Sequence, residues 1–160
     1  MLAVLHLPGA PSYMTDTQKI AHIRDGVACQ YEIAQRHAKL TIRGPVTRET
    51  IAQLGADIDR VLRSVQALSA AISLEKAAVE LSLEQLNASP TLLSDAIRNL
   101  PIAVVVRPES MNLFRAHAWA AAQTGLLRAA FVDPLAASRW AEQTRMDYLL
   151  RRYCRTEEAA

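Results

Sequence analysis

The sequence predicts a single α/β domain in which helices cover a mixed, mostly parallel sheet, in the order β-β-α-β-α-β-α-β-α. Three patterns in the 160 residues lead to this fold class. Residues 38–43 alternate apolar and polar side chains, residues 51–72 repeat apolar side chains at spacings of three and four, and residues 102–106 are all apolar. The first pattern indicates a half-buried strand, the second an amphipathic helix, and the third a strand covered on both faces.

The first two strands are expected at Cys29–Gln35 and Ala38–Arg43. The short link between them, Arg36 and His37, should make the pair an antiparallel hairpin. The Gly-Pro pair at 44–45 should end the second strand, because proline cannot donate a hydrogen bond to a neighbouring strand.

A long helix is expected to begin after Thr47 as its N-cap and to carry its apolar stripe to Ile72. The stripe is typical of packing onto a sheet, and it also leaves open pairing with a second copy in a homodimer. Residues 76–84 alternate with a period of two, which favours a strand. The Glu, Ala and Leu content of residues 75–86 also fits a continuing helix, so both remain open.

The second half of the chain predicts two more strands and three helices, each marked by a cap, a glycine or a proline. Their expected positions are a short helix from Ser89 to about Asn99, a strand at Ile102–Val106, a helix from a Ser110 cap to Gly125, a strand in LLRAAFV, and a last helix begun by Asp133 and Pro134. Because parallel strands need crossover connections, this order favours parallel pairing after the first hairpin.

Domain organisation is expected to be simple. Residues 1–28 are interpreted as an N-terminal extension with a short helix at Thr17–Arg24, residues 29–153 as the domain, and residues 154–160 as a tail. Both Met1 and Met14 fit a translation start. No apolar run approaches the roughly 18 residues of a membrane span, and a signal peptide is not indicated, so a cytoplasmic protein is expected.

Composition argues against several function classes. The net charge of +2 is too small to indicate a nucleic-acid partner, and the five isolated glycines build no phosphate-binding loop. Cys29 and Cys154 are expected as reduced thiols. Because the histidines and cysteines lack paired ligand spacing, we expect no metal and no cofactor.

The order of elements from Cys29 to Leu150, together with the segments VELSLEQLNASPT and GLLRAAFVDPLAASRWAEQ, resembles the STAS domain in its SpoIIAA-like (STAS/SEC14-like) branch. The resemblance implies a bacterial, non-catalytic regulatory domain that binds a protein partner, as anti-sigma factor antagonists do. The SEC14-like side of the resemblance implies the alternative function, binding of a lipid or another small hydrophobic ligand.

In anti-sigma factor antagonists, a serine at the start of the helix after the central strand is phosphorylated by a kinase-like partner. Ser89 matches that position, while Ala88 and Pro90 replace the family's Asp and its Ser or Thr. The resemblance thus implies Ser89, Thr91 and Ser94 as candidate phosphorylation or partner-binding residues. From the residues themselves, Ser89 followed by Pro90 equally fits a plain helix N-cap.

A cavity for a hydrophobic ligand would be lined by Leu113, Phe114, Trp119 and Phe131, although apolar side chains at this spacing also fit an ordinary core.

A hydrolase would need a nucleophile, a base and an orienting carboxylate. Ser89 or Ser94, His117 and Asp133 supply those residue types, but no G-x-S-x-G nucleophile elbow surrounds either serine. The sequence therefore favours a protein that is not an enzyme.

Overall fold

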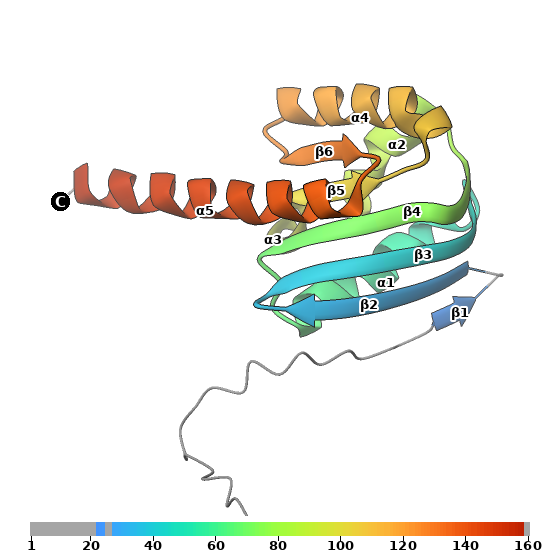
Figure 1. Cartoon of the computed structure of the whole chain (residues 1–160), viewed down its shortest axis with the longest axis horizontal. Helices are drawn as coiled ribbons and strands as arrows, with labels where there is room; N and C mark the ends of the chain where they lie inside the picture. The colour runs from blue at the N-terminus through green and yellow to red at the C-terminus, as the bar shows by residue number, and fades with distance from the viewer. Residues whose placement is uncertain (1–21, 25–26, 159–160) are drawn as a thin grey trace, which may run out of the picture.

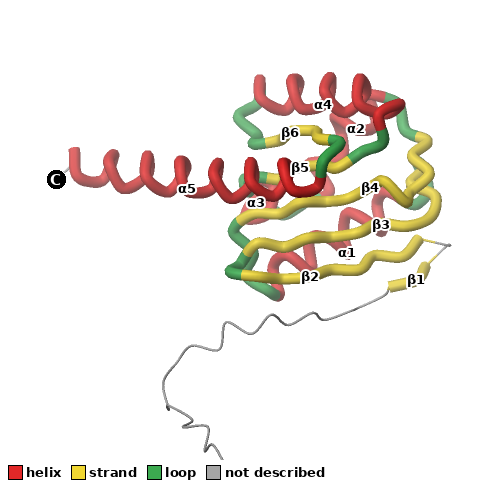
Figure 2. Tube along the Cα trace, in the orientation of Figure 1, coloured by secondary structure: helices red, strands yellow, loops and turns green. Residues whose placement is uncertain are grey.

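The computed structural model describes residues 22–24 and 27–158. Its strands are β1 (His22–Arg24), β2 (Val27–Ala34), β3 (His37–Thr47), β4 (Ser69–Glu80), β5 (Ile102–Val105) and β6 (Arg128–Phe131). Its helices are α1 (Ile51–Ser64), α2 (Leu83–Ala88), α3 (Asp95–Arg98), α4 (Met111–Gln123) and α5 (Pro134–Glu158), with short 3-10 helices η1 (Ser89–Leu92) and η2 (Pro108–Ser110). Figure 2 shows how these helices and strands alternate along the chain.

Within the described residues, one six-stranded sheet is formed, and its strands lie side by side in chain order from β1 to β6. The pairs β1–β2 and β2–β3 are antiparallel, whereas β3–β4, β4–β5 and β5–β6 are parallel. The predicted α/β class with a mixed, mostly parallel sheet is confirmed. Residues 22–24 form an additional strand, so the helix expected at Thr17–Arg24 is wrong there, and residues 17–21 lie outside the described part.

The two faces of the sheet carry different helices (Figure 1). The long helix α5 crosses the face of β4 and β5, where Ala137 and Ala141 pack against Ala103 and Val105. Helix α1 packs on the opposite face over β3 and β4, and α2 and α4 continue that layer towards β6. The helices therefore cover both faces of the sheet, as expected where crossover connections join parallel strands.

The β2–β3 hairpin turns at Gln35 and Arg36, whose φ angles are 51° and 61°. Two successive left-handed residues are typical of a tight two-residue hairpin turn. The link thus comes one residue earlier than predicted, and His37 is the first residue of β3 rather than part of the turn.

Strand β3 does not end at Gly44 and Pro45 as predicted but continues to Thr47. Gly44 takes a φ of 93° just after a register shift, and Pro45 stays in line with Ala78 of β4. Within the described residues, β3 pairs with β2 only as far as Arg43. Beyond Arg43, including at Pro45, β3 pairs with β4. A residue without an N–H is tolerated where one side of the strand has no ladder bond to make.

The long helix predicted to reach Ile72 ends at Ser64, and Thr50 rather than Thr47 is its N-cap residue. Strand β4 then begins at Ser69, so the strand predicted at 76–84 was placed too late. Ile72 packs into the same core as the α1 stripe, which is why the apolar spacing continues through the change from helix to strand. That stripe is buried in the protein's own core.

Apart from the helix predicted at Ser89 to about Asn99, which is replaced by η1 and α3, the other predicted elements are close to their expected places, with two differences at the termini. Val27 and Ala28, expected in the extension, belong to β2, and residues 154–158, expected in a tail, belong to α5. Asp133 begins α5 as predicted, because its Oδ1 accepts a hydrogen bond from the backbone N–H of Leu135 at 3.0 Å. Figure 1 shows the second half of α5 extending beyond the sheet.

The first half of α5 is tied to the sheet through a buried polar contact. The Nδ1 of His37 lies 2.8 Å from Oγ of Ser69, and its Nε2 lies 3.2 Å from Oγ of Ser138. All three residues are buried. Burial lowers the pKa of His37, so the ring is neutral at neutral pH.

Among the described residues, no helix combines the length and apolarity that crossing a bilayer requires. Cys29 is buried and Cys154 is exposed, and both are free thiols. Burial, with a further contribution from the Asp57 carboxylate, raises the pKa of Cys29 to about 11, which keeps this thiol protonated and unreactive.

Candidate functional site

An apolar pocket of about 130 Å³ lies between the sheet and the layer formed by α1, α2, η1 and α4. Strands β3, β4 and β5 provide its floor, and the helices provide its walls. Representative lining residues are Ile42, Ile72 and Val104 from the sheet and Leu54, Pro90 and Phe114 from the helical layer.

The pleat of the sheet explains the floor. Ile72 and Val104 are partners in the β4–β5 register and therefore face the same side. Their neighbours Ala71 and Ala103 point to the opposite face, beneath α5. One face of the parallel strands thus packs against a helix, while the other faces the pocket.

The wall formed by η1 lies directly against α1. A Cβ atom built on Gly55 would be 2.9 Å from the Cβ of Leu92, so only glycine permits this approach. Leu92 and Leu93 both line the pocket. The close approach therefore closes the pocket on the side of α1.

Asp59 of α1 forms a hydrogen bond with the segment that follows η1. Its Oδ1 accepts a hydrogen bond from the backbone N–H of Ser94 at 2.7 Å, and its Oδ2 accepts one from Nε of Arg63 at 2.6 Å. Burial by itself would raise the pKa of Asp59, but the hydrogen bonds from Ser94 and Arg63 outweigh it and leave the pKa below its ordinary value. Asp59 is therefore an ionised anchor for the segment that follows η1.

Three polar residues belong to the pocket wall: Ser89, His117 and Arg128. The Nδ1 of His117 lies 3.0 Å from Oδ1 of Asn87 in α2. Because an amide oxygen only accepts, Nδ1 carries the proton, and in the neutral ring Nε2 is then an acceptor. Burial, together with the positive charge of Arg128, lowers the pKa of His117 and keeps the ring neutral at neutral pH.

Arg128, the first residue of β6, is half-buried and lines the pocket. Its Nη1 donates to the carbonyls of Leu100 at 2.8 Å and Leu127 at 2.9 Å, and its Nη2 donates to that of Arg98 at 2.8 Å. Burial lowers the pKa of Arg128 to about 10, which still leaves the guanidinium charged at neutral pH. Arg128 is not among the residues predicted for a site, although an arginine inside the apolar run LLRAAFV is a visible signal.

Ser89 is not the N-cap of a helix, and that interpretation is wrong. It follows the last residue of α2, and its hydroxyl donates to the carbonyl of Leu86 at 2.6 Å. The helix start with a capping box lies earlier, at Ser82 and Gln85. The single helix predicted from Ser89 to Asn99 is instead η1 followed by the short α3.

Thr91 and Ser94 lie on the same segment as Ser89 but in different surroundings. Thr91 is exposed and its hydroxyl donates to the carbonyl of Ala88 at 2.7 Å. Ser94 is half-buried and precedes α3, with its backbone N–H held by Asp59. Of the three candidate hydroxyl residues, Ser89 alone lines the pocket.

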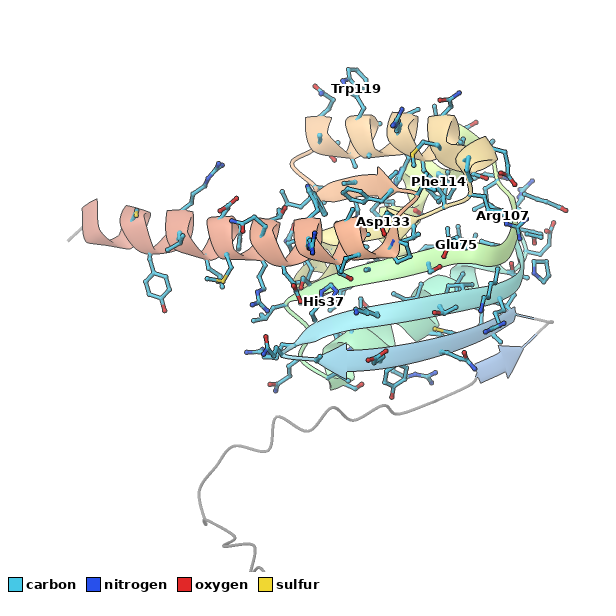
Figure 3. The ribbon with its side chains drawn as sticks, in the orientation of Figure 1. His37, Glu75, Arg107, Phe114, Trp119 and Asp133 are labelled. Atoms are coloured by element: carbon cyan, nitrogen blue, oxygen red, sulfur yellow. The ribbon has the colours of Figure 1, made fainter. Side chains whose placement is uncertain are left out.

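The four residues expected to line a hydrophobic cavity do not meet in one place, so that grouping is corrected. Phe114 lines the pocket, and Leu113 packs against the neighbouring core cluster. Trp119 is 70% exposed on the outer side of α4 (Figure 3). Phe131 contacts Trp140 of α5 with ring centroids 6.0 Å apart, because its position in β6 faces the other side of the sheet.

The hydrolase constellation is not assembled around His117. The ring of His117 is oriented by Asn87, while the carboxylate of Asp133 caps α5. The hydroxyl of Ser89 is directed to a backbone carbonyl. Among the described residues, no cluster of three or more His, Cys, Asp or Glu side chains could hold a metal ion.

A second, wider groove of about 540 Å³ lies on the opposite face of the sheet, beside the start of α5. Charged side chains of both signs line it, including Glu32, Lys39, Glu75 and Lys76. Ligand sites are mostly apolar with a few convergent polar groups, and the pocket under α1 and α4 meets that description better.

Comparisons with known proteins concern the fold. No protein-family model and no curated protein matches the chain. Among solved structures, the chain is similar to an uncharacterised protein of the DUF3478 family from Shewanella loihica PV-4, which is described as having a SpoIIAA-like fold. The two are 18% identical, the match covers 76% of this chain and 98% of that chain, and the TM-score is 0.47.

Proposed function

We propose that this protein is a non-catalytic binding protein whose pocket takes a small, largely apolar ligand. The observation that carries the proposal is the apolar pocket of about 130 Å³ under α1, η1 and α4. An apolar cavity of about 150 Å³ in another protein holds a benzene molecule, whereas sites for drug-sized ligands are about 300–1,000 Å³. The ligand we propose is therefore one ring or a short chain. The same size limit applies to the lipid or small hydrophobic ligand that the sequence resemblance implies.

The pocket also supports a regulatory role through a protein partner. Pro90 and Leu93 line the pocket, while Thr91 between them is exposed. A ligand that contacts Pro90 and Leu93 would reduce the conformational freedom of η1 and of the residues up to Ser94. We propose residues 89–94 as the partner-binding segment, whose order depends on the ligand.

Phosphorylation of this segment is a second candidate switch, and the accessibility of Thr91 favours it. The hydroxyl of Thr91 is on an exposed residue, whereas that of Ser89 is half-buried at the pocket wall. We expect any phosphoryl group on this segment to map to Thr91. Peptide mapping by mass spectrometry of protein purified from its own cells tests this, and a phosphoryl group on Ser89 would contradict it.

Ligand binding is tested with toluene, a neutral molecule of the proposed size, followed by NMR chemical-shift changes. Saturable shifts should appear at residues that line the pocket. Val104→Phe should abolish them because the added ring fills the space above β5. Val132→Phe makes the same change at a residue that is 45% exposed and lies outside the pocket, and it should leave toluene binding unchanged.

Both variants must first show a cooperative thermal transition, which establishes that they are folded. The proposal is wrong if the wild-type protein gives no saturable shifts, or if the folded Val104→Phe variant binds toluene as the wild type does.

A further inference from the structure

We infer that the ligand of this pocket is a small amphipathic anion, with an apolar body among the aliphatic side chains and a carboxylate-like group held by Arg128. This inference rests on the proposed function and names the ligand class of the same pocket. The volume of about 130 Å³ restricts the apolar body to about one ring.

The guanidinium of Arg128 brings a positive charge to the pocket wall. Its guanidinium donates to three backbone carbonyls, those of Arg98, Leu100 and Leu127. These contacts satisfy N–H groups, but neutral carbonyls do not cancel a unit positive charge. Arg128 is half-buried, and a charge that is partly removed from water without a counter-charge is costly, so an anion at this place would be stabilised.

The described surroundings of Arg128 supply no such counter-charge. Among the described residues, no aspartate or glutamate lines the pocket. The ion pairs Arg60–Asp57, Arg63–Asp59 and Arg98–Asp95 lie within the described ranges, and none of these three includes Arg128. The Arg128 guanidinium is therefore a cation without a described counter-charge at a mostly apolar site, where an anionic ligand could pair with it.

The other polar residues fit this ligand class. His117 is next to Arg128 in the wall and is neutral, so it adds no second positive charge. Its orientation is fixed by Asn87 at 3.0 Å. Electrostatic recognition of the anion thus depends on one residue, which makes the inference testable by one substitution.

The test compares benzoate with benzamide, which has nearly the same shape but no charge, by isothermal titration calorimetry at pH 7 and low salt. Because a charge-assisted hydrogen bond is roughly twice as strong as a neutral one, the wild-type protein should bind benzoate at least about tenfold more tightly than benzamide. Arg128→Gln should reduce benzoate affinity to the level of benzamide and change benzamide affinity less than about threefold.

Arg107→Gln is the matched control. Arg107 also donates to a backbone carbonyl, that of Glu75 at 2.6 Å, but it does not line this pocket. This variant should keep the tenfold preference for benzoate. Circular dichroism shows whether each variant is folded. The ratio of benzoate to benzamide affinity in the wild-type protein tests the inference without any substitution.

The outcomes separate the two proposals. Equal affinities for benzoate and benzamide in the wild type, or a benzoate preference that survives in folded Arg128→Gln, would overturn the anionic ligand while leaving the binding pocket intact. Absence of saturable toluene binding would overturn the proposed function and this inference with it.

Discussion

Replacing Asp59 by alanine should lower the free energy of unfolding by about 2–4 kcal/mol. The carboxylate is buried and accepts hydrogen bonds from the backbone N–H of Ser94 and from Arg63. Without it, the Ser94 N–H loses its acceptor and the segment after η1 loses its attachment to α1. Urea denaturation measures the free energy, and faster hydrogen exchange at the Ser94 amide should accompany the loss.

Asp95→Ala is the control for this prediction. Asp95 lies one residue beyond Ser94, and its side chain is 89% exposed and pairs with Arg98 at 3.2 Å. Exposed ion pairs contribute little, so the loss should be below about 1 kcal/mol. A loss for Asp95→Ala equal to that for Asp59→Ala would mean that the buried anchor has no special role.

The free energy of unfolding should also fall as the pH is lowered from 7 to 5, by up to about 1.4 kcal/mol per pH unit for each of His37 and His117. The folded pKa of each histidine lies below 6.5, chiefly because of burial. Between that folded pKa and about 6.5, the unfolded chain binds more protons than the folded one. The stabilisation is therefore complete above about pH 6.5 and is lost as the pH falls towards the folded pKa.

Glutamine at each position removes the titrating ring and tests this assignment. His37 faces Glu142, Lys39 and Arg145, and His117 faces Arg128. His37→Gln and His117→Gln should each reduce the pH dependence measured by urea denaturation between pH 5 and 7, and the double variant should reduce it further. If the double variant keeps the wild-type slope, other groups are responsible for the acid sensitivity.

The sequence predicted the local elements whose signals are short-range. Alternation identified the β2–β3 hairpin, the apolar run identified β5, and Asp133 with Pro134 identified the start of α5. Each signal depends on neighbours within a few residues, such as the cap that Asp133 forms with Leu135. The element order, and with it the mixed, mostly parallel sheet, followed from these signals.

The boundary between α1 and β4 was not predictable in the same way. Ile72 and the α1 stripe share one core, so apolar spacing continues while the backbone changes from helix to strand. The role of Ser89 was also misjudged, because the capping box at Ser82 and Gln85 starts α2 earlier and leaves Ser89 at its end. In both cases the sequence pattern was compatible with two backbone conformations, and packing selected one.

By itself, the sequence determined the fold class, the order of most elements and the absence of the spacing typical of metal or nucleotide sites. Only the tertiary structure decided which residues meet. It brought Arg128 of β6, His117 of α4 and Ser89 of η1 to one apolar pocket, and it directed Phe131 and Trp119 away from it. The physical reason is that local signals fix backbone conformation over a few residues, whereas a pocket is made by strand register and helix packing between distant segments.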